Sequence, residues 1–256
     1  MRLAGPATAL AAEPGGFNGY LALGGAIVPD FEGSKDYQPV PFVAGKAGYD
    51  EFYIEARGPK VRANVMPANV LGFGVELGPS AAYRFGRSDV ENGQVDSLRD
   101  IDGSIAIGGF AKLYTKALLQ SRDILGFEFE ALNSVGEQRD GATVSFGPFY
   151  SFEPVDRVRI GFKASATYAN DRYNRTYFGI DADNALRSGL APYEAKGGFK
   201  DVGFSINATY RFAEHWAVSA MVGVTRLVGD AADSPVVKDA GSATAGIAST
   251  GIVYSF

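Results

Sequence analysis

The last fourteen residues of the chain, from Ala243 to Phe256, alternate between two kinds of side chain. Side chains at positions i, i+2 and i+4 share one face of a β-strand. One face therefore carries Ala248, Thr250, Ile252, Tyr254 and Phe256. This face is apolar and ends in two aromatic rings, which need either the core of a soluble sheet or the boundary of a lipid bilayer to cover them. The stretch predicts a β fold in which the last strand is covered on one side.

The same strand carries a pattern that outer-membrane barrels share in their C-terminal strand. The pattern is a polar residue, glycine two positions later, an aromatic or apolar residue three positions after that, and a final aromatic residue. Here these are Ser249, Gly251, Tyr254 and Phe256, and we expect them to act as a barrel-assembly signal. The alternative is a soluble strand that happens to end in phenylalanine, so the other strands must decide.

The composition is compatible with a membrane barrel and unfavourable to a membrane helix. Hydrophobic residues make up 46% of the chain and the mean hydropathy is -0.03, and no run approaches the roughly 18 apolar residues of a spanning helix. Alternating strands average to such a neutral hydropathy. Glycine is abundant, at 33 residues, and aromatic residues reach 12%, which favours short strands in a barrel. The chain has no cysteine, so disulfides and thiolate metal sites are excluded.

Charge and the N-terminal segment add two further expectations. The net charge is -5, with both signs mixed along the chain, so no nucleic-acid footprint is present. Residues 1–16 contain one arginine, small apolar residues and the A-x-A-like site Ala9-Leu10-Ala11. We interpret 1–16 as a leader or residual signal segment, although its apolar part is short for a secretory signal. Residues 17–256 are expected to form a single barrel domain.

Alternation recurs through the rest of the chain and predicts about twelve strands. Their lengths are close to the roughly 9–11 residues that cross a bilayer at a tilt. The predicted strands are 17–28, 38–45, 50–56, 60–66, 71–85, 102–113, 125–131, 143–152, 157–168, 201–212, 216–224 and 243–256.

The connections between these strands differ in length in a regular way. Long ones are predicted at 29–36, 86–100, 133–140, 170–200 and 228–242, and short ones at 46–48, 67–69, 153–156 and 213–215. With antiparallel neighbours, the long loops fall on one rim and the short turns on the other, as in transmembrane barrels. Two connections break the rule, because Gly58-Pro59 is short and 114–121 is long for its side. The sequence therefore predicts an all-β, closed, antiparallel up-and-down transmembrane barrel.

Charged residues within the strands are expected to face the lumen. Glu128 and Glu130 share one face, and a cationic face is formed by Arg157, Arg159 and Lys163. Two carboxylates on one face could serve as a paired-carboxylate active site. We favour the interpretation that these charges pair with one another across neighbouring strands inside the barrel.

The remaining candidates for chemistry are weak. His215 is the only histidine and stands in a short turn beside Trp216, so we interpret it as a polar turn residue rather than a general base or a metal ligand. The segment 230–235 contains two aspartates but lacks the spacing and the distal glutamate of an EF-hand loop. No catalytic residue, cofactor or metal site is predicted.

Two segments resemble the MipA/OmpV family of Gram-negative outer-membrane proteins. The more specific is 226–237, RLVGDAADSPVV, which contains Gly229, Asp230, Asp233, Ser234 and Pro235. The other motif residues lie at 177–201 and comprise Tyr177, Phe178, Gly179, Gly197, Gly198, Lys200 and Asp201. The resemblance runs from about position 17 to the last residue.

This resemblance implies a non-enzymatic barrel in the outer-membrane lipid that acts as a scaffold in cell-wall remodelling. The partners implied are a murein-cleaving lytic transglycosylase and a murein-synthesising penicillin-binding protein. Topology places these periplasmic partners at the short-turn rim, where we expect Lys46, Asn69, Glu153, Glu214 and His215. The alternatives are a narrow channel for small solutes and, with less support, a barrel enzyme that acts on lipid. Whether the 170–200 loop plugs the lumen is left open.

Overall fold

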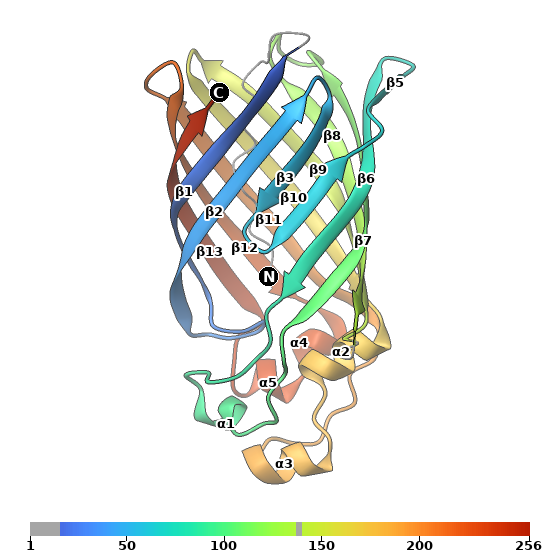
Figure 1. Ribbon diagram of the computed structural model, residues 1–256. Helices are drawn as coiled ribbons and strands as arrows, with labels where there is room; N and C mark the ends of the chain where they lie inside the picture. Colours follow the sequence, from blue (N-terminus) through green and yellow to red (C-terminus); the bar gives the residue numbers. More distant parts are fainter. Residues whose placement is uncertain (1–15, 137–139) are drawn as a thin grey trace.

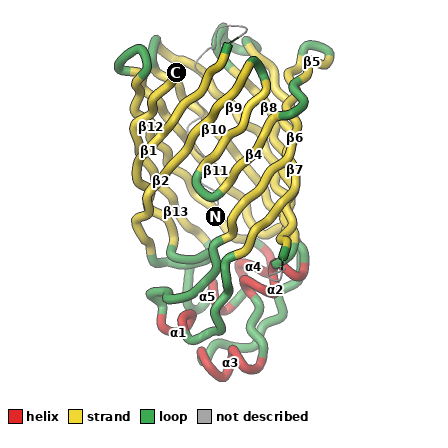
Figure 2. The backbone as a smooth tube through the Cα atoms, viewed as in Figure 1, coloured by secondary structure: helices red, strands yellow, loops and turns green. Residues whose placement is uncertain are grey.

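The computed structural model describes residues 16–136 and 140–256, so the predicted leader, 1–16, lies outside the described residues except for its last position. The described chain forms a tall barrel of tilted antiparallel strands (Figures 1 and 2). The strands are β1 (Phe17–Pro29), β2 (Tyr37–Tyr49), β3 (Phe52–Arg57), β4 (Lys60–Asn64), β5 (Ala68–Val70), β6 (Phe73–Arg84), β7 (Ser104–Lys116), β8 (Ile124–Val135), β9 (Ala142–Val155), β10 (Val158–Ala169), β11 (Gly198–Arg211), β12 (Trp216–Leu227) and β13 (Thr244–Ser255).

The wall of the barrel contains twelve of these thirteen strands, because β5 pairs with β6 alone and lies beyond the wall. Successive wall strands pair with one another, and β4 pairs with β6. The last strand, β13, pairs with both β12 and β1 and so closes the sheet. The predicted closed up-and-down barrel of about twelve strands is confirmed.

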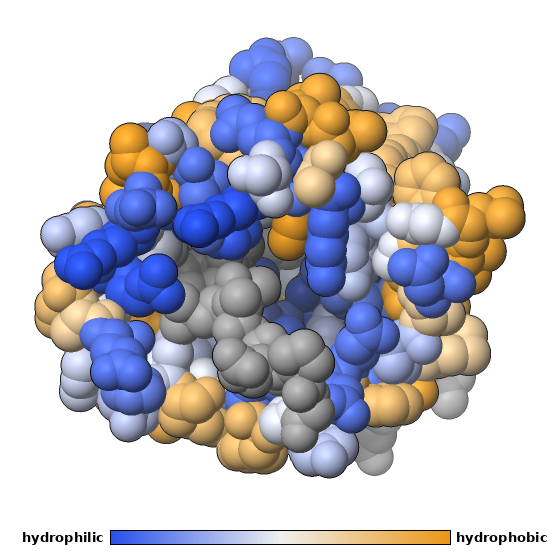
Figure 3. Space-filling view, turned by 90° about the horizontal axis from the view of Figure 1, so that it is seen from above, coloured by the Kyte–Doolittle hydropathy of each residue, from blue (hydrophilic) through white to orange (hydrophobic). Residues whose placement is uncertain are grey.

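The two faces of the wall differ as the alternation predicts. On β12, Val218 and Val222 are exposed on the outside, whereas Ser219 and Met221 are buried inside. Seen along the barrel axis (Figure 3), hydrophilic side chains gather within the ring and many hydrophobic ones lie around its perimeter. This arrangement satisfies a lipid environment outside and a polar lumen inside.

The C-terminal strand has the predicted orientation. Tyr254 and Phe256 point outward, and Val253 and Ser255 are buried inside. The ring of Phe256 stacks on Phe17 with centroids 5.7 Å apart, and the peptide groups of Phe256 and Gly19 exchange two hydrogen bonds of 3.1 Å. The two ends of the sheet are thereby held together at one rim by both backbone bonds and aromatic contacts.

The barrel has two unlike rims, which we call the loop rim and the turn rim. At the loop rim, the connections between wall strands contain five helices that cover the opening (Figure 1). These are α1 (Gly93–Asp96), α2 (Asp171–Phe178), α3 (Ala182–Ser188), α4 (Gly229–Asp233) and α5 (Pro235–Lys238). We call these helices and the segments that join them the loop cap. No helix in the described residues is long and apolar enough to span a membrane.

The turn rim differs from the prediction at the β2–β3 hairpin and at three other connections. Residues 46–48 do not form a turn, because β2 continues to Tyr49 and the chain reverses at Asp50 and Glu51. Gly48 suggested a turn, but it is required for another reason: a Cβ atom there would lie 2.6 Å from the carbonyl oxygen of Phe52.

Three other connections at this rim are also shifted. The predicted turn at 67–69 overlaps β5, and the reversal follows at Leu71 and Gly72, both with positive φ. The strand β7 extends to Lys116, so the predicted connection 114–121 is the shorter segment 117–123. The strand β9 extends to Val155, so the turn predicted at 153–156 is formed by residues 156 and 157 alone.

The closing seam between β1 and β13 supplies a test of the fold. Gly24 lies opposite Gly251, and a Cβ atom at Gly24 would collide with the carbonyl of Thr250 and lie 2.6 Å from the Cα of Gly251. We expect Gly24→Ala to destabilise the folded barrel by about 1–3 kcal/mol through overpacking. The measurement is the folded fraction against urea concentration, followed by heat-modifiable migration in SDS gels.

The neighbouring glycine is the matched control. The nearest atom to a Cβ at Gly25 is 4.0 Å away, so Gly25→Ala should change stability by less than about 0.5 kcal/mol. Equal effects of the two substitutions would contradict the register of the seam.

Candidate functional site

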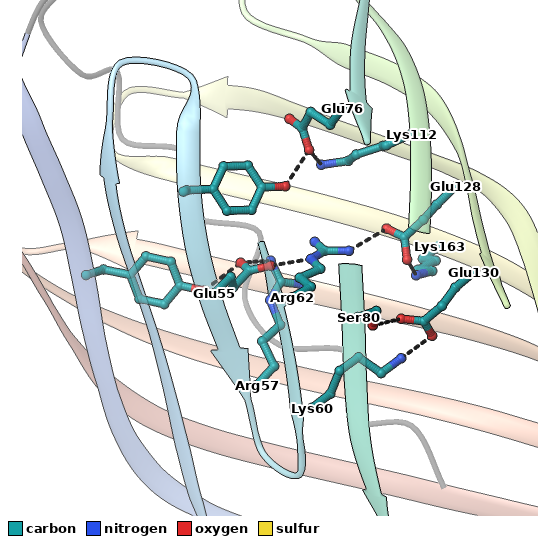
Figure 4. A network of polar contacts seen from close by, with 12 residues as sticks. Glu55, Arg57, Lys60, Arg62, Glu76, Ser80, Lys112, Glu128, Glu130 and Lys163 are labelled. Carbon is teal, nitrogen blue, oxygen red and sulfur yellow. Dashed lines mark hydrogen bonds and ion pairs between the residues drawn. The ribbon is translucent and has the colours of Figure 1, made fainter. Parts of the chain in front are cut away.

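The lumen contains three neighbouring groups of ion pairs and hydrogen bonds, which together we call the lumenal charge network (Figure 4). Its members project inward from β3, β4, β6, β7, β8 and β10. They are Glu55, Arg57, Lys60, Arg62, Glu76, Ser80, Lys112, Glu128, Glu130 and Lys163, with the hydroxyls of Tyr20 and Tyr53.

Glu55 on β3 is the most densely bonded carboxylate of the network. Arg62 Nε donates to Glu55 Oε2 at 2.8 Å, and Arg57 Nη2 donates to Glu55 Oε1 at 2.6 Å. The hydroxyl of Tyr20 donates to the same Oε1 at 3.1 Å. The Glu55 side chain is only 4% exposed. A charge buried to this degree is stable only when it is paired, as it is here.

Arginine and lysine side chains of β4 reach strands that are not their neighbours. Arg62 Nη1 lies 3.3 Å from Glu128 on β8, and Lys60 pairs with Glu130 on the same strand. Glu128 also accepts a 2.9 Å bond from Lys163 on β10. Because β6 and β7 stand between β4 and β8 in the wall, these side chains run across the lumen rather than along its surface.

The inward direction predicted for the charged strand residues is mostly confirmed. Glu128, Glu130 and Lys163 all belong to the network, and each carboxylate is engaged by a cation. Arg157 is the exception, since it lies in the exposed β9–β10 turn with φ of 69°. The extension of β9 moved the turn onto this residue, which the sequence pattern had placed in the strand.

A second buried group lies under the loop cap, around Lys200. Its Nζ pairs with Glu32 and lies 2.7 Å from Asp201 Oδ2, and the hydroxyl of Tyr173 donates to Glu32 at 2.9 Å. Lys200 and Asp201 both face inward because the β10–β11 register shifts between Thr167 and Tyr168. Such a bulge sets two residues of one strand against one of its partner.

The residues of the family motif mainly build the loop cap. Phe178 is fully buried, and its carbonyl accepts a 2.6 Å bond from the hydroxyl of Ser234. Asp230 Oδ2 accepts from the backbone of Lys196 at 2.8 Å. Pro235 is buried at the start of α5, whereas Asp233 is exposed.

The other motif residues have similar roles. Tyr177 donates to Asp140 at 3.3 Å, and the Gly197 amide donates to Asp171 at 2.6 Å. Gly229 begins α4 with φ of 55°, while Gly179 ends α2 and Gly198 begins β11. These contacts are structural, and the described residues contain no cluster of three or more histidine or carboxylate side chains suited to a metal ion.

The loop cap also has a cleft of about 670 Å³ that sequence reasoning did not anticipate. Its charged lining residues are Arg87, Arg99, Arg175, Asp100, Asp181 and Glu194. Arg87 is buried and donates to the carbonyl of Tyr177 at 3.1 Å, and burial lowers the pKa of this guanidinium to about 10. The formal charges of the cleft balance, so it has no net preference for an anion.

The closed wall, the apolar outer face and the outward aromatic residues Phe17, Tyr254 and Phe256 at one rim define a transmembrane β-barrel of the outer-membrane class. The COG4313 outer membrane channel from Pseudomonas putida F1 has the same kind of fold, with a TM-score of 0.52 at 12% identity over 98% of this chain and 99% of that one. A family model described as "MltA-interacting protein MipA" matches residues 21–256. The chain belongs to this family of MltA-interacting proteins, as the motif residues had indicated.

Two characterised members show how far the sequence similarity extends. The MltA-interacting proteins of Escherichia coli (strain K12) and Shigella flexneri are each 31% identical to this chain over 87 residues. The match covers 34% of this chain and 34% of each relative. This is a protein of the Gram-negative outer membrane, so the loop rim faces the exterior and the turn rim the periplasm.

The lumenal charge network generates a stability prediction. Arg62 is 9% exposed and pairs with both Glu55 and Glu128, so Arg62→Met leaves the buried Glu55 and the half-buried Glu128 each short of one partner. We expect the free energy of unfolding to fall by about 3–5 kcal/mol. Trp216, the only tryptophan, reports unfolding in guanidinium chloride by fluorescence.

A surface pair provides the control. Arg122 is 62% exposed and contacts Glu153 and Asp156 at the turn rim, so Arg122→Met should change stability by less than about 1 kcal/mol. A loss of similar size in both variants would show that burial of the network contributes nothing.

The Glu32 carboxyl generates a prediction of how the stability of the barrel depends on pH. Burial raises the pKa of this carboxyl, but favourable charge and hydrogen-bond interactions, with the Lys200 ammonium foremost among them, together bring the folded-state pKa below its usual value. The ion pair therefore contributes its full stabilisation of the folded state above the unfolded pKa of about 4.3. This stabilisation is lost as the pH falls through the lower folded-state pKa. Glu32→Gln should reduce the melting temperature at pH 7, and the difference from the wild type should close in acid.

The exposed Glu91 on a neighbouring loop is the matched position for this test. In thermal scans from pH 7 to strongly acidic buffer, the difference in melting temperature between Glu91→Gln and the wild type should not change with pH in this way. A Glu32→Gln difference that persists unchanged in acid would contradict the ion pair.

Proposed function

We propose that this protein is a non-enzymatic scaffold whose turn rim binds a lytic transglycosylase in the periplasm. The matched family and its relatives are named for an interaction with MltA, and the family resemblance implies that the partner cleaves murein. A penicillin-binding protein is the second partner in this proposal, carried over from the resemblance alone. The support from this chain lies in the shape and chemistry of the turn rim.

The β5–β6 hairpin is the observation that carries the proposal. It projects past the wall at the turn rim (Figure 1), and Leu71 at its tip is 94% exposed. Val70 beside it and Phe73, the residue paired with Val70 across the hairpin, are also exposed, at 52% and 46%. Together they form an apolar tip at the rim that faces the periplasm.

Leu71 is unfavourable at this position for two independent reasons. Its φ of 52° lies in the left-handed region, which costs a non-glycine residue about 1–2 kcal/mol. Its side chain also remains in contact with solvent instead of being buried, which forgoes about 1.5–3 kcal/mol for a leucine. Both penalties are compatible with a side chain that inserts into an apolar pocket of a partner, the usual form of an interface anchor.

Charged residues elsewhere on the turn rim are suited to the polar part of an interface. Arg122 and Glu153 pair at 3.1 Å, and Glu214 and His215 are exposed in the β11–β12 turn, across the barrel from the tip (Figure 1). Lys46 does not belong to this surface, contrary to expectation, because its ammonium lies inside the barrel 4.0 Å from the ring centre of Tyr53.

Two further predicted rim residues have local roles. Asn69 Oδ1 accepts the amide of Gly72 at 3.1 Å and so stabilises the β5–β6 turn. His215 Nδ1 lies 2.8 Å from the carbonyl oxygen of Ser255, which fixes its ring at the seam of the barrel. These contacts support a structural role for both residues rather than a catalytic one.

A conducting role has less support from the lumen. Arg62 and Lys60 extend from β4 to carboxylates on β8, so their side chains occupy the lumen at that level. We therefore place the function at the rim and not in the lumen.

The apolar tip gives the test of this proposal. Leu71→Asp should weaken binding of a purified lytic transglycosylase to the detergent-solubilised barrel by at least about tenfold, or 1.4 kcal/mol. Surface plasmon resonance on the immobilised barrel measures the dissociation constant, and heat-modifiable migration confirms that the variant is folded.

Leu186 on α3 is the matched control, because it is 88% exposed but stands at the opposite rim. Leu186→Asp should bind as the wild type does. Unchanged affinity of Leu71→Asp, or equal losses in both variants, would overturn the assignment of the tip as the docking element.

A further inference from the structure

The cleft in the loop cap has a rigid frame made of two short antiparallel bridges. Arg87 and Ile101, in the connection between β6 and β7, exchange backbone hydrogen bonds of 2.8 and 2.9 Å. Ile180 and Tyr193, in the connection between β10 and β11, exchange two bonds of 2.8 Å. All four residues line the cleft. Because paired backbone holds its side chains in place, the cleft is a preformed site rather than a gap between free loops.

The two connections are also tied to each other beside the cleft. The Arg99 guanidinium pairs with the Asp181 carboxylate, and the Arg99 amide donates to Asn184 Oδ1 at 2.9 Å. These contacts join the segment after α1 to the start of α3 at the far end of the loop cap (Figure 1). The volume of about 670 Å³ falls in the upper part of the range of roughly 300–1,000 Å³ that small-molecule sites occupy.

Arg87 is a buried cation of this cleft whose hydrogen bonding is incomplete. Its side chain donates to the Tyr177 carbonyl, but its Nε is buried and has no hydrogen-bond partner in the part of the chain that the structure describes. The nearby Asp100 carboxylate favours the charged form of Arg87, although the two form no ion pair. Buried charges are ordinarily paired. An anion in the cleft would therefore lower the free energy of this guanidinium.

Two exposed charges of opposite sign also line the cleft, Arg175 on α2 and Glu194 beside the Ile180–Tyr193 bridge. Neither side chain makes an ion pair or a hydrogen bond with any residue that the structure describes. The other four charged residues of the lining have an opposite charge beside them within the cleft. The cleft thus has one free cation and one free anion, and complementarity requires a ligand with one group of each charge.

We propose that the cleft binds a short peptide with free termini, which it takes from the exterior. The peptide carboxylate pairs with Arg175, with the buried charge of Arg87 in support, and the terminal ammonium pairs with Glu194. Ile101 and Pro192, which also line the cleft, give an apolar surface to the peptide side chains. A simple anion or cation would leave one of the free charges unmatched. The site lies at the rim opposite the β5–β6 hairpin, so it is independent of the scaffold role.

The test is isothermal titration calorimetry of the detergent-solubilised wild-type barrel with four forms of trialanine. The peptide is used with both termini free, acetylated at the N-terminus, amidated at the C-terminus, and modified at both ends. Acetylation removes the ammonium and amidation removes the carboxylate. We expect saturable binding of the free peptide and a loss of at least about fivefold in affinity for each modification. Free alanine should bind more weakly than trialanine, because it cannot span both charges.

Two variants assign each terminus to its residue. Arg175→Gln should weaken binding of free trialanine by at least about fivefold, and amidation should then have no further effect. Glu194→Gln should do the same for acetylation. Such a loss of additivity identifies the two groups that interact. Heat-modifiable migration in SDS gels confirms that each variant is folded.

Arg172→Gln is the matched control, because Arg172 is exposed on the same helix as Arg175 but does not line the cleft. This variant should bind trialanine as the wild type does. The proposal is overturned by an absence of saturable binding, by equal affinity for the free and the doubly modified peptide, or by equal losses in Arg172→Gln and Arg175→Gln.

Discussion

No water reaches the hydrocarbon layer of a membrane, so each peptide group of a spanning strand must find its hydrogen-bond partner within the sheet. The barrel meets this requirement by pairing its last strand with its first, with mutual bonds between Gly19 and Phe256 at 3.1 Å. The outer apolar belt, the polar interior and the separation into two rims all follow from that closure. Along residues 37–42, β2 pairs only with β1 among the described residues, and the prolines at 39 and 41 have no N–H that would be left without a partner there.

Closure also determines the form of the interior. Charges that face inward are removed from bulk water, and they stay ionised only where opposite charges and hydroxyls surround them. Glu55 and Glu128 are each held by two cations. The interior is therefore divided into a charged side, held by side chains of β3, β4 and β8, and an apolar side around Phe42.

The sequence was sufficient to predict the strand number and the outward face, because an alternation of period two survives in every wall strand. The sequence was insufficient where a residue is required by a contact between strands or by a bulge, which the local pattern does not reveal. Gly48 suggested a turn but provides close contact between β2 and β3. Lys200 disturbs the alternation because a bulge precedes it. The partners of Arg62 could not be predicted either, since contacts across a lumen depend on strand tilt and register, which no local pattern specifies.

The bulge at Lys200 has a consequence for how such a barrel can change in length. Because side chains alternate between the two faces of a strand, one residue added to or removed from a wall strand exchanges the inward and outward positions of all residues beyond it. Here an extra residue is absorbed near the end of β11, and the alternation resumes with Val202 facing outward. Insertions in this fold should therefore accumulate in the loop cap, arrive in pairs within a strand, or be neutralised by a bulge close to a rim.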